Sequence, residues 1–265
     1  MSLRDSLRGQ LDNLFDDGWQ PKQYDDVPVT HATHIMVTAD AHVPKHDPAL
    51  FAEVLAQAVE EGIEELVHAG DLMDMEEFSR FGIDDQTSSF GRNIKATGKL
   101  LRLIADTGVH QWWTMGNHEQ RLFRALPQLN MRLLASMAGV DDLIDAGKLS
   151  VSDSTVLHAS VGNWMIVHPA AYGSTPGVVP GKLATRFQRN VISGHEHHWG
   201  MGMDETGQFY HVSTGGMFDS RLHKYYNMNI TGHRTWVSGY VTLHRGRPML
   251  YRGDIAKQAL VPEFA

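Results

Sequence analysis

Five apolar, strand-like segments of this chain each end in a short cluster of glycine, aspartate, asparagine or histidine residues. This order constrains the fold more than any other feature, because ligands of open α/β sheets bind at the carboxyl ends of the strands. Clusters that lie far apart in the sequence are therefore expected to meet at one site. The five clusters are Asp40–His42, Gly70–Asp71, Gly116–Glu119, His168 and Gly194–His198.

Segments with helix signals separate these clusters. Asp47 and Pro48 form a helix start, with the aspartate as the cap and the proline in the first turn, and Gly62 ends that helix. After the last cluster, apolar and polar residues alternate around turn residues, as in antiparallel strands. We expect strands at 34–38, 65–69, 109–115, 163–167 and 190–193, helices at 48–61, 93–106, 119–126 and 181–189, and antiparallel strands within 208–252.

This order of elements predicts an α/β fold of two packed sheets flanked by helices. The sequence has no internal repeat, low-complexity tract or linker, so residues 31–265 are expected to form a single domain. Residues 1–30 are predicted to be an N-terminal extension that is helical in part, because leucines recur at helical spacing over Leu3–Leu14.

The composition excludes several classes of protein. The 265 residues include no cysteine, which rules out disulfides, thiolate zinc sites, iron–sulfur clusters and cysteine nucleophiles. No apolar run is long enough to span a bilayer, and Met1–Gln10 lacks the apolar region of a secretory signal. We therefore expect a cytoplasmic protein with no membrane partner; the oligomeric state is left open.

The net charge of −8 is unevenly distributed. Residues 1–90 carry 5 Lys/Arg and 19 Asp/Glu, a balance of −14, whereas residues 91–180 and 181–253 have balances of +2 and +5. A polyanion is thus not favoured by the charge as a whole, although the C-terminal half could supply a basic surface.

The clusters contain the donor atoms of a metal centre. Histidine is the commonest metal ligand in proteins, and this chain has 16 histidines. A set of carboxylate, amide and imidazole donors without thiolates suits Mn²⁺, Fe, Zn²⁺, Co²⁺ or Ni²⁺. The candidate ligands are Asp40, His42, Asp71, Asn117, His168, His195 and His197. Apart from His118, His46 and His198, the remaining histidines, His223 among them, are expected to be structural or surface residues.

These motifs, in this order over about residues 34–198, resemble those of the calcineurin-like metallophosphoesterase family, and in particular its small single-domain phage and bacterial members. The matching pieces are Asp40-Ala-His42, Gly70-Asp71-Leu-Met-Asp74, Gly116-Asn-His-Glu119, Val167-His168 and Gly194-His-Glu-His197. The resemblance implies a four-layer sandwich in which two mixed β-sheets are flanked by helices, with two metal ions at one edge.

The resemblance also implies a role for each matching residue. One metal would be held by Asp40, His42 and His197, and the other by Asn117, His168 and His195. Asp71 would bridge the two ions. His118 would stand beside the substrate as the general acid, oriented by Asp74. Two divalent ions are therefore the expected cofactor, with Mn²⁺ as the first expectation.

The chemistry of phosphate esters supports these roles. Two cations about 3.5–4 Å apart neutralise the phosphate oxygens and lower the pKa of a bridging water, so a metal-bridging hydroxide would attack phosphorus. The leaving oxygen needs a proton, and His118 is the expected donor because the unperturbed imidazole pKa of about 6.5 lies near neutral pH. A carboxylate on the other ring nitrogen, here that of Asp74, would fix the tautomer and favour the protonated form.

Differences from the motifs of other branches of the family argue against several classes of substrate. Asp74 stands where purple acid phosphatases have a tyrosine ligand, and Met75-Glu76 replaces the Arg-Gly of protein serine/threonine phosphatases. The double-strand-break nucleases of the family usually have histidine at the position of Asp74 and aspartate at that of Glu119, so that branch is not matched closely either.

Three hypotheses for function follow. The first is a phosphodiesterase, such as a nuclease, that acts on DNA, RNA or a nucleotide. The second is a small-molecule phosphomonoesterase or nucleotide-pyrophosphate hydrolase, and the third is an inactive metal-bound scaffold. Arg121, Tyr172 and His46 follow the motifs and are the candidate substrate-binding residues. A nuclease should have a basic groove beside the metals, whereas a small-molecule enzyme should have a closed pocket.

Overall fold

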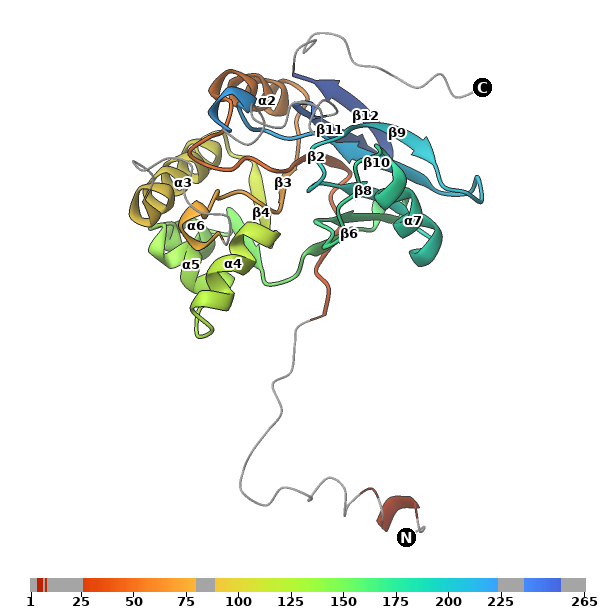
Figure 1. Cartoon of the computed structure of the whole chain (residues 1–265), viewed down its shortest axis with the longest axis horizontal. Helices are drawn as coiled ribbons and strands as arrows, with labels where there is room; N and C mark the ends of the chain where they lie inside the picture. Colours follow the sequence, from red (N-terminus) through yellow and green to blue (C-terminus); the bar gives the residue numbers. More distant parts are fainter. Residues whose placement is uncertain (1–3, 7, 9–25, 80–88, 224–235, 254–265) are drawn as a thin grey trace.

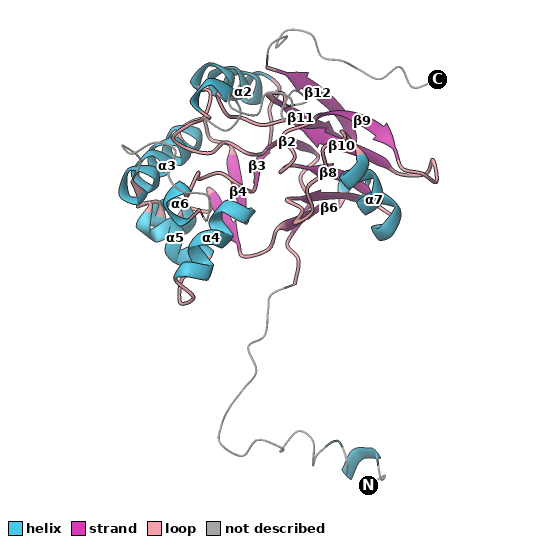
Figure 2. Ribbon diagram, viewed as in Figure 1, coloured by secondary structure: helices cyan, strands magenta, loops and turns pink. Residues whose placement is uncertain are grey.

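The computed structural model of the chain describes residues 4–6, 8, 26–79, 89–223 and 236–253. Two six-stranded sheets lie in the middle of the molecule, and helices flank them on both sides (Figures 1 and 2). The predicted α/β fold of two mixed sheets flanked by helices is therefore confirmed. The leucines that recur at helical spacing in the N-terminal extension lie outside the described residues, and the domain boundary at residue 31 stays a prediction.

The first sheet has the strand order β12-β11-β2-β3-β4-β5. Strands β2 to β5 run parallel, while β11 is antiparallel to β2 and to β12. Its strands are β2 (His34–Thr38), β3 (Glu65–Ala69), β4 (His110–Thr114), β5 (Leu149–Ser152), β11 (Gly239–His244) and β12 (Arg247–Arg252).

The second sheet has the order β1-β6-β7-β8-β10-β9. Its central strands β7, β8 and β10 are parallel, and β6 and β9 pair antiparallel to β7 and β10. Its strands are β1 (Val29–Thr30), β6 (Val156–Ala159), β7 (Trp164–Val167), β8 (Asn190–Ser193), β9 (Trp199–Met203) and β10 (Tyr210–Thr214). Both sheets thus contain parallel strands whose carboxyl ends carry the motif clusters.

Helices α2 to α6 cover the first sheet, and α7 covers the second (Figure 1). The start of α2 follows the predicted cap, because the Asp47 carboxylate accepts hydrogen bonds from the backbone N–H groups of Ala49 (2.9 Å) and Leu50 (3.2 Å). The helices are α2 (Pro48–Glu60), α3 (Phe90–Ala105), α4 (Asn117–Ala125), α5 (Met131–Met137), α6 (Asp141–Asp145) and α7 (Val178–Phe187), with single 3₁₀ turns η1 (Glu76–Phe78), η2 (Val161–Asn163) and η3 (Ser220–Leu222).

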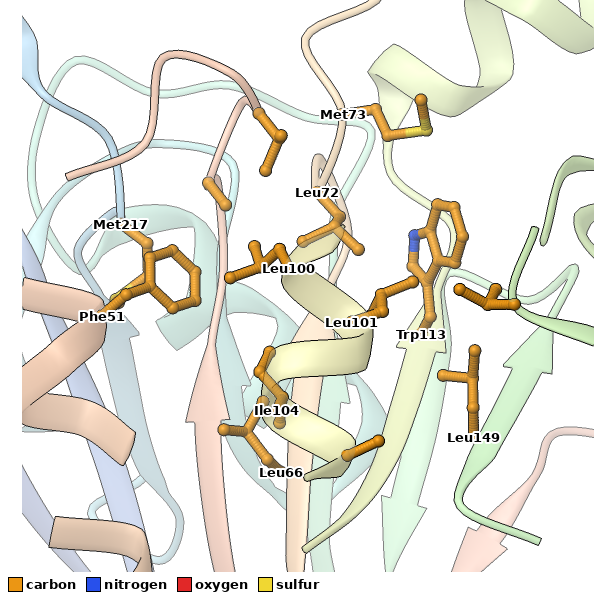
Figure 3. Close-up of a cluster of buried hydrophobic side chains, with 14 of the residues drawn as sticks. Phe51, Leu66, Leu72, Met73, Leu100, Leu101, Ile104, Trp113, Leu149 and Met217 are labelled. Carbon is orange, nitrogen blue, oxygen red and sulfur yellow. The ribbon is translucent and has the colours of Figure 1, made fainter. Parts of the chain in front are cut away.

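Side-chain alternation along the strands separates two large apolar cores. In β2, Ile35 and Val37 face the other sheet, whereas Met36 between them faces the helices. On the helical side, Leu101 and Ile104 of α3 pack with buried side chains of the first sheet such as Trp113 (Figure 3). These cores fix both sheets and so fix the edge at which the parallel strands end.

Several elements were not expected from the sequence. Strands β5 and β6 and helices α5 and α6 lie within 127–162, for which the sequence pattern indicated no element. Strand β9 was also missed, because Gly200 and Gly202 alternate with its larger residues and glycine has low strand propensity. A Cβ at Gly202 would lie 2.8 Å from Nε2 of His211, so the second glycine makes room for the neighbouring strand's side chain. No helix in the described ranges is long and apolar enough to cross a membrane.

Candidate metal centre

The first group of candidate ligands joins the ends of β2 and β8. Nε2 of His42 lies 3.2 Å from Nε2 of His197, and Nε2 of His197 lies 3.3 Å from Oδ1 of Asp40. All three side chains are buried, and Oδ1 of Asp40 has no hydrogen-bond partner among the described residues. A buried carboxylate oxygen facing two imidazole nitrogens is costly without a cation, so this donor set fits a divalent metal.

The second group joins the ends of β3, β4, β7 and β8. Nε2 of His168 lies 3.4 Å from Oδ2 of Asp71 and 3.0 Å from Oδ1 of Asn117. His195 belongs to the same group, with one ligand atom of each of Asp71, His168 and His195 within 4.8 Å of the others. The backbone carbonyl of Ala69 accepts a hydrogen bond from Nδ1 of His168 at 3.0 Å, which leaves Nε2 to face the group.

Asp71 stands between the two groups. Oδ2 of Asp71 faces His168 at 3.4 Å and Nε2 of His118 at 3.6 Å, and Asp71 also forms a close set with His42 and His118. Thus the structure brings together all seven residues that the sequence proposed as ligands. Their individual roles as ligands stay a prediction.

The backbone at the candidate ligands is strained. Asp40, His42, Asp71, His195 and His197 all have φ between 50° and 76°, a left-handed conformation that side chains other than glycine rarely adopt. They are five of the nine non-glycine residues with positive φ in the described part of the chain. Such strain concentrates at functional sites, where the surrounding structure holds it in place.

Glycines let the strand ends approach one another closely. A Cβ on Gly116 would lie 2.2 Å from both the backbone nitrogen and Oδ1 of Asp71, and one on Gly70 would lie 2.6 Å from the ring of His168. The glycines before Asp71 and Asn117 are therefore required for contact between the motif loops.

Glu119 fixes two of these loops to each other. Its Oε2 accepts hydrogen bonds from the backbone N–H groups of Asp71 (3.1 Å) and Gly116 (2.9 Å), and its Oε1 accepts one from Met73 (3.0 Å). The side chain is fully buried, and burial together with the Asp71 carboxylate raises the pKa of Glu119 to about 7. In the sequence Glu119 was noted only as the end of a motif, although a glutamate three residues after a helix cap is typical of this backbone-binding role.

His118 lies beside both groups with its Nε2 toward Asp71. Its Nδ1 hydrogen-bonds to the backbone carbonyl of Asp74, and its ring packs edge to face with His42 at 4.4 Å between centroids. The Asp74 carboxylate is 3.7 Å from Nδ1 of His118, whereas it is 3.5 Å from Nδ1 of His42 and 2.9 Å from Nζ of Lys45. Asp74 therefore contacts His118 mainly through its carbonyl, and its carboxylate orients His42.

The surroundings of the histidines shift their pKa values in different directions. Burial would lower the pKa of His168, but the Asp71 carboxylate raises it to about 9. For His118 burial dominates and lowers the pKa to about 3, so this ring is neutral at pH 7 unless an anion lies beside it. Burial would raise the pKa of Asp71, yet neighbouring histidines, His118 and His168 first, hold it well below its usual range.

A cleft of about 710 Å³ opens from the second group of ligands. It extends over α4, where Arg121 is half-buried and Arg124 is exposed. Nη1 of Arg121 lies 3.1 Å from Nδ1 of His118, which puts the guanidinium at the reacting end of this cleft. The cleft is lined by Phe78, Ser79, Asn117, Gln120, Arg121, Arg124, Ala125, Thr155, His168, Pro169, Ala170 and His195. We call it the metal cleft.

The other two candidate substrate residues lie apart from this cleft. Tyr172 is 49% exposed, and its ring is 5.9 Å from that of His195, so it stands at the rim of the second ligand group. His46 instead packs on Phe51 with 5.6 Å between ring centroids and does not line the metal cleft. The structure thus places Arg121 and Tyr172, but not His46, at the opening of the centre.

Three further residues at the centre were missed by sequence reasoning. Nζ of Lys45 lies 2.9 Å from both the Asp74 and the Glu76 carboxylates in a buried network. The buried His223 ring is 5.4 Å from that of His42, and the Trp236 ring is 4.1 Å from that of His197. His223 and Trp236 follow no strand-end motif, so their sequence context carried no signal.

The model of the calcineurin-like phosphoesterase family matches residues 33–199, well over half of the chain and the whole stretch from β2 to the last motif. The chain belongs to this family. As a calcineurin-like phosphoesterase it is a metal-dependent hydrolase of phosphate esters, and its candidate ligands form the groups that a dimetal centre needs.

The chain is also similar to individual proteins. This phosphoesterase is 26% identical over 255 residues to the Gene 54 protein of Mycobacterium phage D29, a match that covers 86% of this chain and 92% of the phage protein. Its fold is similar to that of the phosphoesterase Yfce from E. coli, with 12% identity, a TM-score of 0.42 and coverage of 86% and 96% of the two chains. A dimetal phosphatase from Danio rerio matches with 12% identity, a TM-score of 0.43 and coverage of 84% and 96%.

Proposed function

We propose that this phosphoesterase is a dinuclear phosphodiesterase that acts on nucleic acid or a nucleotide. The observation that supports it is the convergence of two ligand groups on Asp71, with His118 and Arg121 on the side where the metal cleft opens. Asp40, His42 and His197 would hold one divalent ion, and Asn117, His168 and His195 the other, with Asp71 between them. Mn²⁺ is the metal we would supply first. When bound, the ions neutralise the phosphate oxygens and activate water for attack on phosphorus.

His118 would deliver the proton that the reaction needs. Its Nδ1 is engaged by the Asp74 carbonyl, so Nε2 is the free proton carrier and points toward Asp71. A phosphodiester beside the ring raises the imidazole pKa from its low value, because a nearby negative charge favours the protonated form. As the P–O bond to the leaving group breaks, Nε2–H donates its proton to that oxygen.

Arg121 would hold the phosphodiester against this histidine. Its Nη1 lies 3.1 Å from Nδ1 of His118, and its guanidinium has no carboxylate within ion-pair distance in the described ranges. A guanidinium without an acidic partner in a half-buried position is suited to a phosphate oxygen. Tyr172, which lies outside the metal cleft with its ring 5.9 Å from that of His195, would contact one of the two ester groups of the substrate.

Metal-stripped protein supplemented with Mn²⁺ tests the reaction with bis-p-nitrophenyl phosphate and p-nitrophenyl phosphate. Preferential, metal-dependent cleavage of the diester supports the phosphodiesterase. Preference for the monoester would instead indicate the small-molecule phosphatase, and no turnover with any of several metals would favour the inactive scaffold.

Two variants separate the assigned roles. His118→Ala should retain both metals and lower turnover by about 10²–10⁴-fold, the usual reach of general acid catalysis. Asp71→Asn should weaken both metals at once. Metal loss in the first variant, or two tightly bound ions in the second, measured by elemental analysis after dialysis, would contradict the assignment.

A further inference from the structure

A second groove lies beside the metal cleft, between α3 and the end of α5. It has a volume of about 590 Å³ and is lined by Phe90, Ile94, Lys95, Lys99, Arg102 and Met137 among others. We call it the basic groove. Nothing in the proposed reaction at the metal centre requires it, yet it combines apolar side chains with three cationic ones.

The basic side chains of α3 share one face. Arg92, Lys95, Lys99 and Arg102 follow one another at spacings of three, four and three residues, which aligns them along the helix. All four are exposed. Lys95 and Lys99 have no carboxylate within ion-pair distance in the part of the chain that the structure describes, whereas Arg102 pairs with Asp142 at 2.8 Å. Among the residues that line the basic groove, Lys95 and Lys99 are thus the charges available to an outside anion.

The charge of this flank differs from that of the whole chain. Residues 89–140, which include α3, α4 and α5, carry seven Lys/Arg and two Asp/Glu, a balance of +5, and one of the two acids is the buried Glu119. The chain as a whole has a net charge of −8. The flank that begins at the metal cleft therefore carries an excess of basic residues, although the chain as a whole is acidic.

The turn η1 connects the cleft and the groove. Phe78 at its end lines the metal cleft, and its ring packs edge to face on Phe90 of the basic groove, with 5.5 Å between centroids. Glu77 is an acidic side chain on this path, and the amide of Asn93 donates a hydrogen bond to its carboxylate at 3.2 Å. Both phenylalanines are partly exposed. The path from the centre is therefore Arg121 and Arg124, then the phenylalanine pair, then Lys95 and Lys99.

We propose that a single-stranded polynucleotide follows this path, with its scissile phosphate at the metal centre and its neighbouring phosphates on Arg124, Lys95 and Lys99. This inference rests on the proposed phosphodiesterase function and names its substrate class. Cationic side chains that follow a groove, with aromatic rings between them, are the features that bind single strands without sequence preference, because phosphates pair with the cations and bases stack on the rings. Along α3, Phe90 and Lys99 are separated by about 14 Å, so only a strand of several nucleotides reaches the second lysine.

Binding of a hydrolysis-resistant strand tests the path without relying on turnover. Fluorescein-labelled phosphorothioate oligothymidylates of 3 and 16 nucleotides are titrated with Mn²⁺-loaded protein, and the anisotropy gives Kd. We expect the 16-mer to bind the wild type much more tightly than the 3-mer. In Lys95→Gln/Lys99→Gln the Kd of the 16-mer should rise roughly 50-fold at 50 mM salt, and the slope of log K against log salt should fall by about 1.4, since each lost phosphate contact removes about 0.7.

A matched control removes two charges elsewhere. Arg245 and Arg247 are exposed in the turn between β11 and β12, which lies at the opposite ends of the strands from the metal centre. Arg245→Gln/Arg247→Gln should bind the 16-mer as the wild type does.

The outcomes distinguish this inference from the proposed function. Equal binding of the 16-mer by the lysine variant and the wild type, equal binding of the 3-mer and 16-mer, or stronger binding of a 16-base-pair duplex would each overturn the single-strand path. If bis-p-nitrophenyl phosphate is cleaved while the 16-mer is not bound, the path is wrong and the phosphodiesterase stands. If the 16-mer binds as expected while no phosphodiester is cleaved with any metal, the phosphodiesterase is wrong and the strand-binding surface stands.

Discussion

Two replacements of Glu119 test whether its carboxylate stabilises the fold by accepting hydrogen bonds from the backbone or only by filling space. Its two oxygens accept three buried N–H groups, from Asp71, Met73 and Gly116, at 2.9–3.1 Å. In Glu119→Gln the amide oxygen can replace Oε2 and keep two of these bonds, while the NH₂ group faces the third donor. One unsatisfied buried N–H costs roughly 1–3 kcal/mol. Glu119→Ala leaves all three unsatisfied, for a loss of roughly 3–9 kcal/mol before any water enters.

Urea denaturation with chelator present measures this difference directly. Since natural domains have a free energy of unfolding of about 5–15 kcal/mol, the alanine variant should be partly unfolded where the glutamine variant is folded. The glutamine variant should also bind Mn²⁺ roughly 10–100-fold more weakly by calorimetry, as expected when a residue that orients a ligand is changed. If the alanine variant is no less stable than the glutamine variant, Glu119 does not act through these N–H groups.

Three other perturbations follow from the geometry. Gly116→Ala places a Cβ 2.2 Å from the backbone nitrogen of Asp71, so it should lower the free energy of unfolding by roughly 1–3 kcal/mol and weaken metal binding. Gly91→Ala has open space at its Cβ and should instead stabilise α3 by roughly 0.5–1 kcal/mol, so equal shifts of the two variants in thermal denaturation would contradict this prediction. Lys45→Met removes the cation beside the buried Asp74 and Glu76 carboxylates and should lower the free energy of unfolding by about 3–5 kcal/mol, while Lys45→Arg should recover part of this loss. A methionine variant as stable in urea as the wild type would show that this network does not stabilise the fold. Burial lowers the pKa of His68 to about 4, so the unfolded chain takes up a proton at higher pH than the folded chain, and stability falls as the pH drops from 6.5 to 4. Over this range the wild type should lose about 3 kcal/mol more of its free energy of unfolding than His68→Gln. Parallel pH profiles of the two proteins would exclude this contribution of His68.

The sequence specified the strand ends better than the loops. Strands β2, β3 and β8 and the cap at Asp47 matched because each rests on a local pattern, and the seven ligand candidates met because parallel strands end at one edge. Strand β9 was missed because Gly202 makes room for His211 of the next strand, a contact that no local pattern reveals.

The surroundings of the centre were less accessible from the sequence. His223 and Trp236 approach the ligand histidines from the segment after β10, and their positions depend on how that segment returns across the site. The Asp74 carboxylate was expected beside His118 because Asp74 lies three positions after Asp71, but Lys45 and His42 compete for it at shorter distances. Such competition is decided by tertiary contacts that spacing alone does not encode.

The two ligand groups each combine residues from both sheets. Asp40, His42, Asp71 and Asn117 follow strands of the first sheet, and His168, His195 and His197 follow strands of the second. A metal ion held by these residues would therefore link the two layers, and its affinity would depend on how the layers are aligned. A substitution deep in the apolar layer between the sheets, at Val37 or Ile192 for example, can slide one layer against the other and weaken this link without touching a ligand. The packing of the layer between the sheets and the affinity of the metal centre are therefore expected to change together.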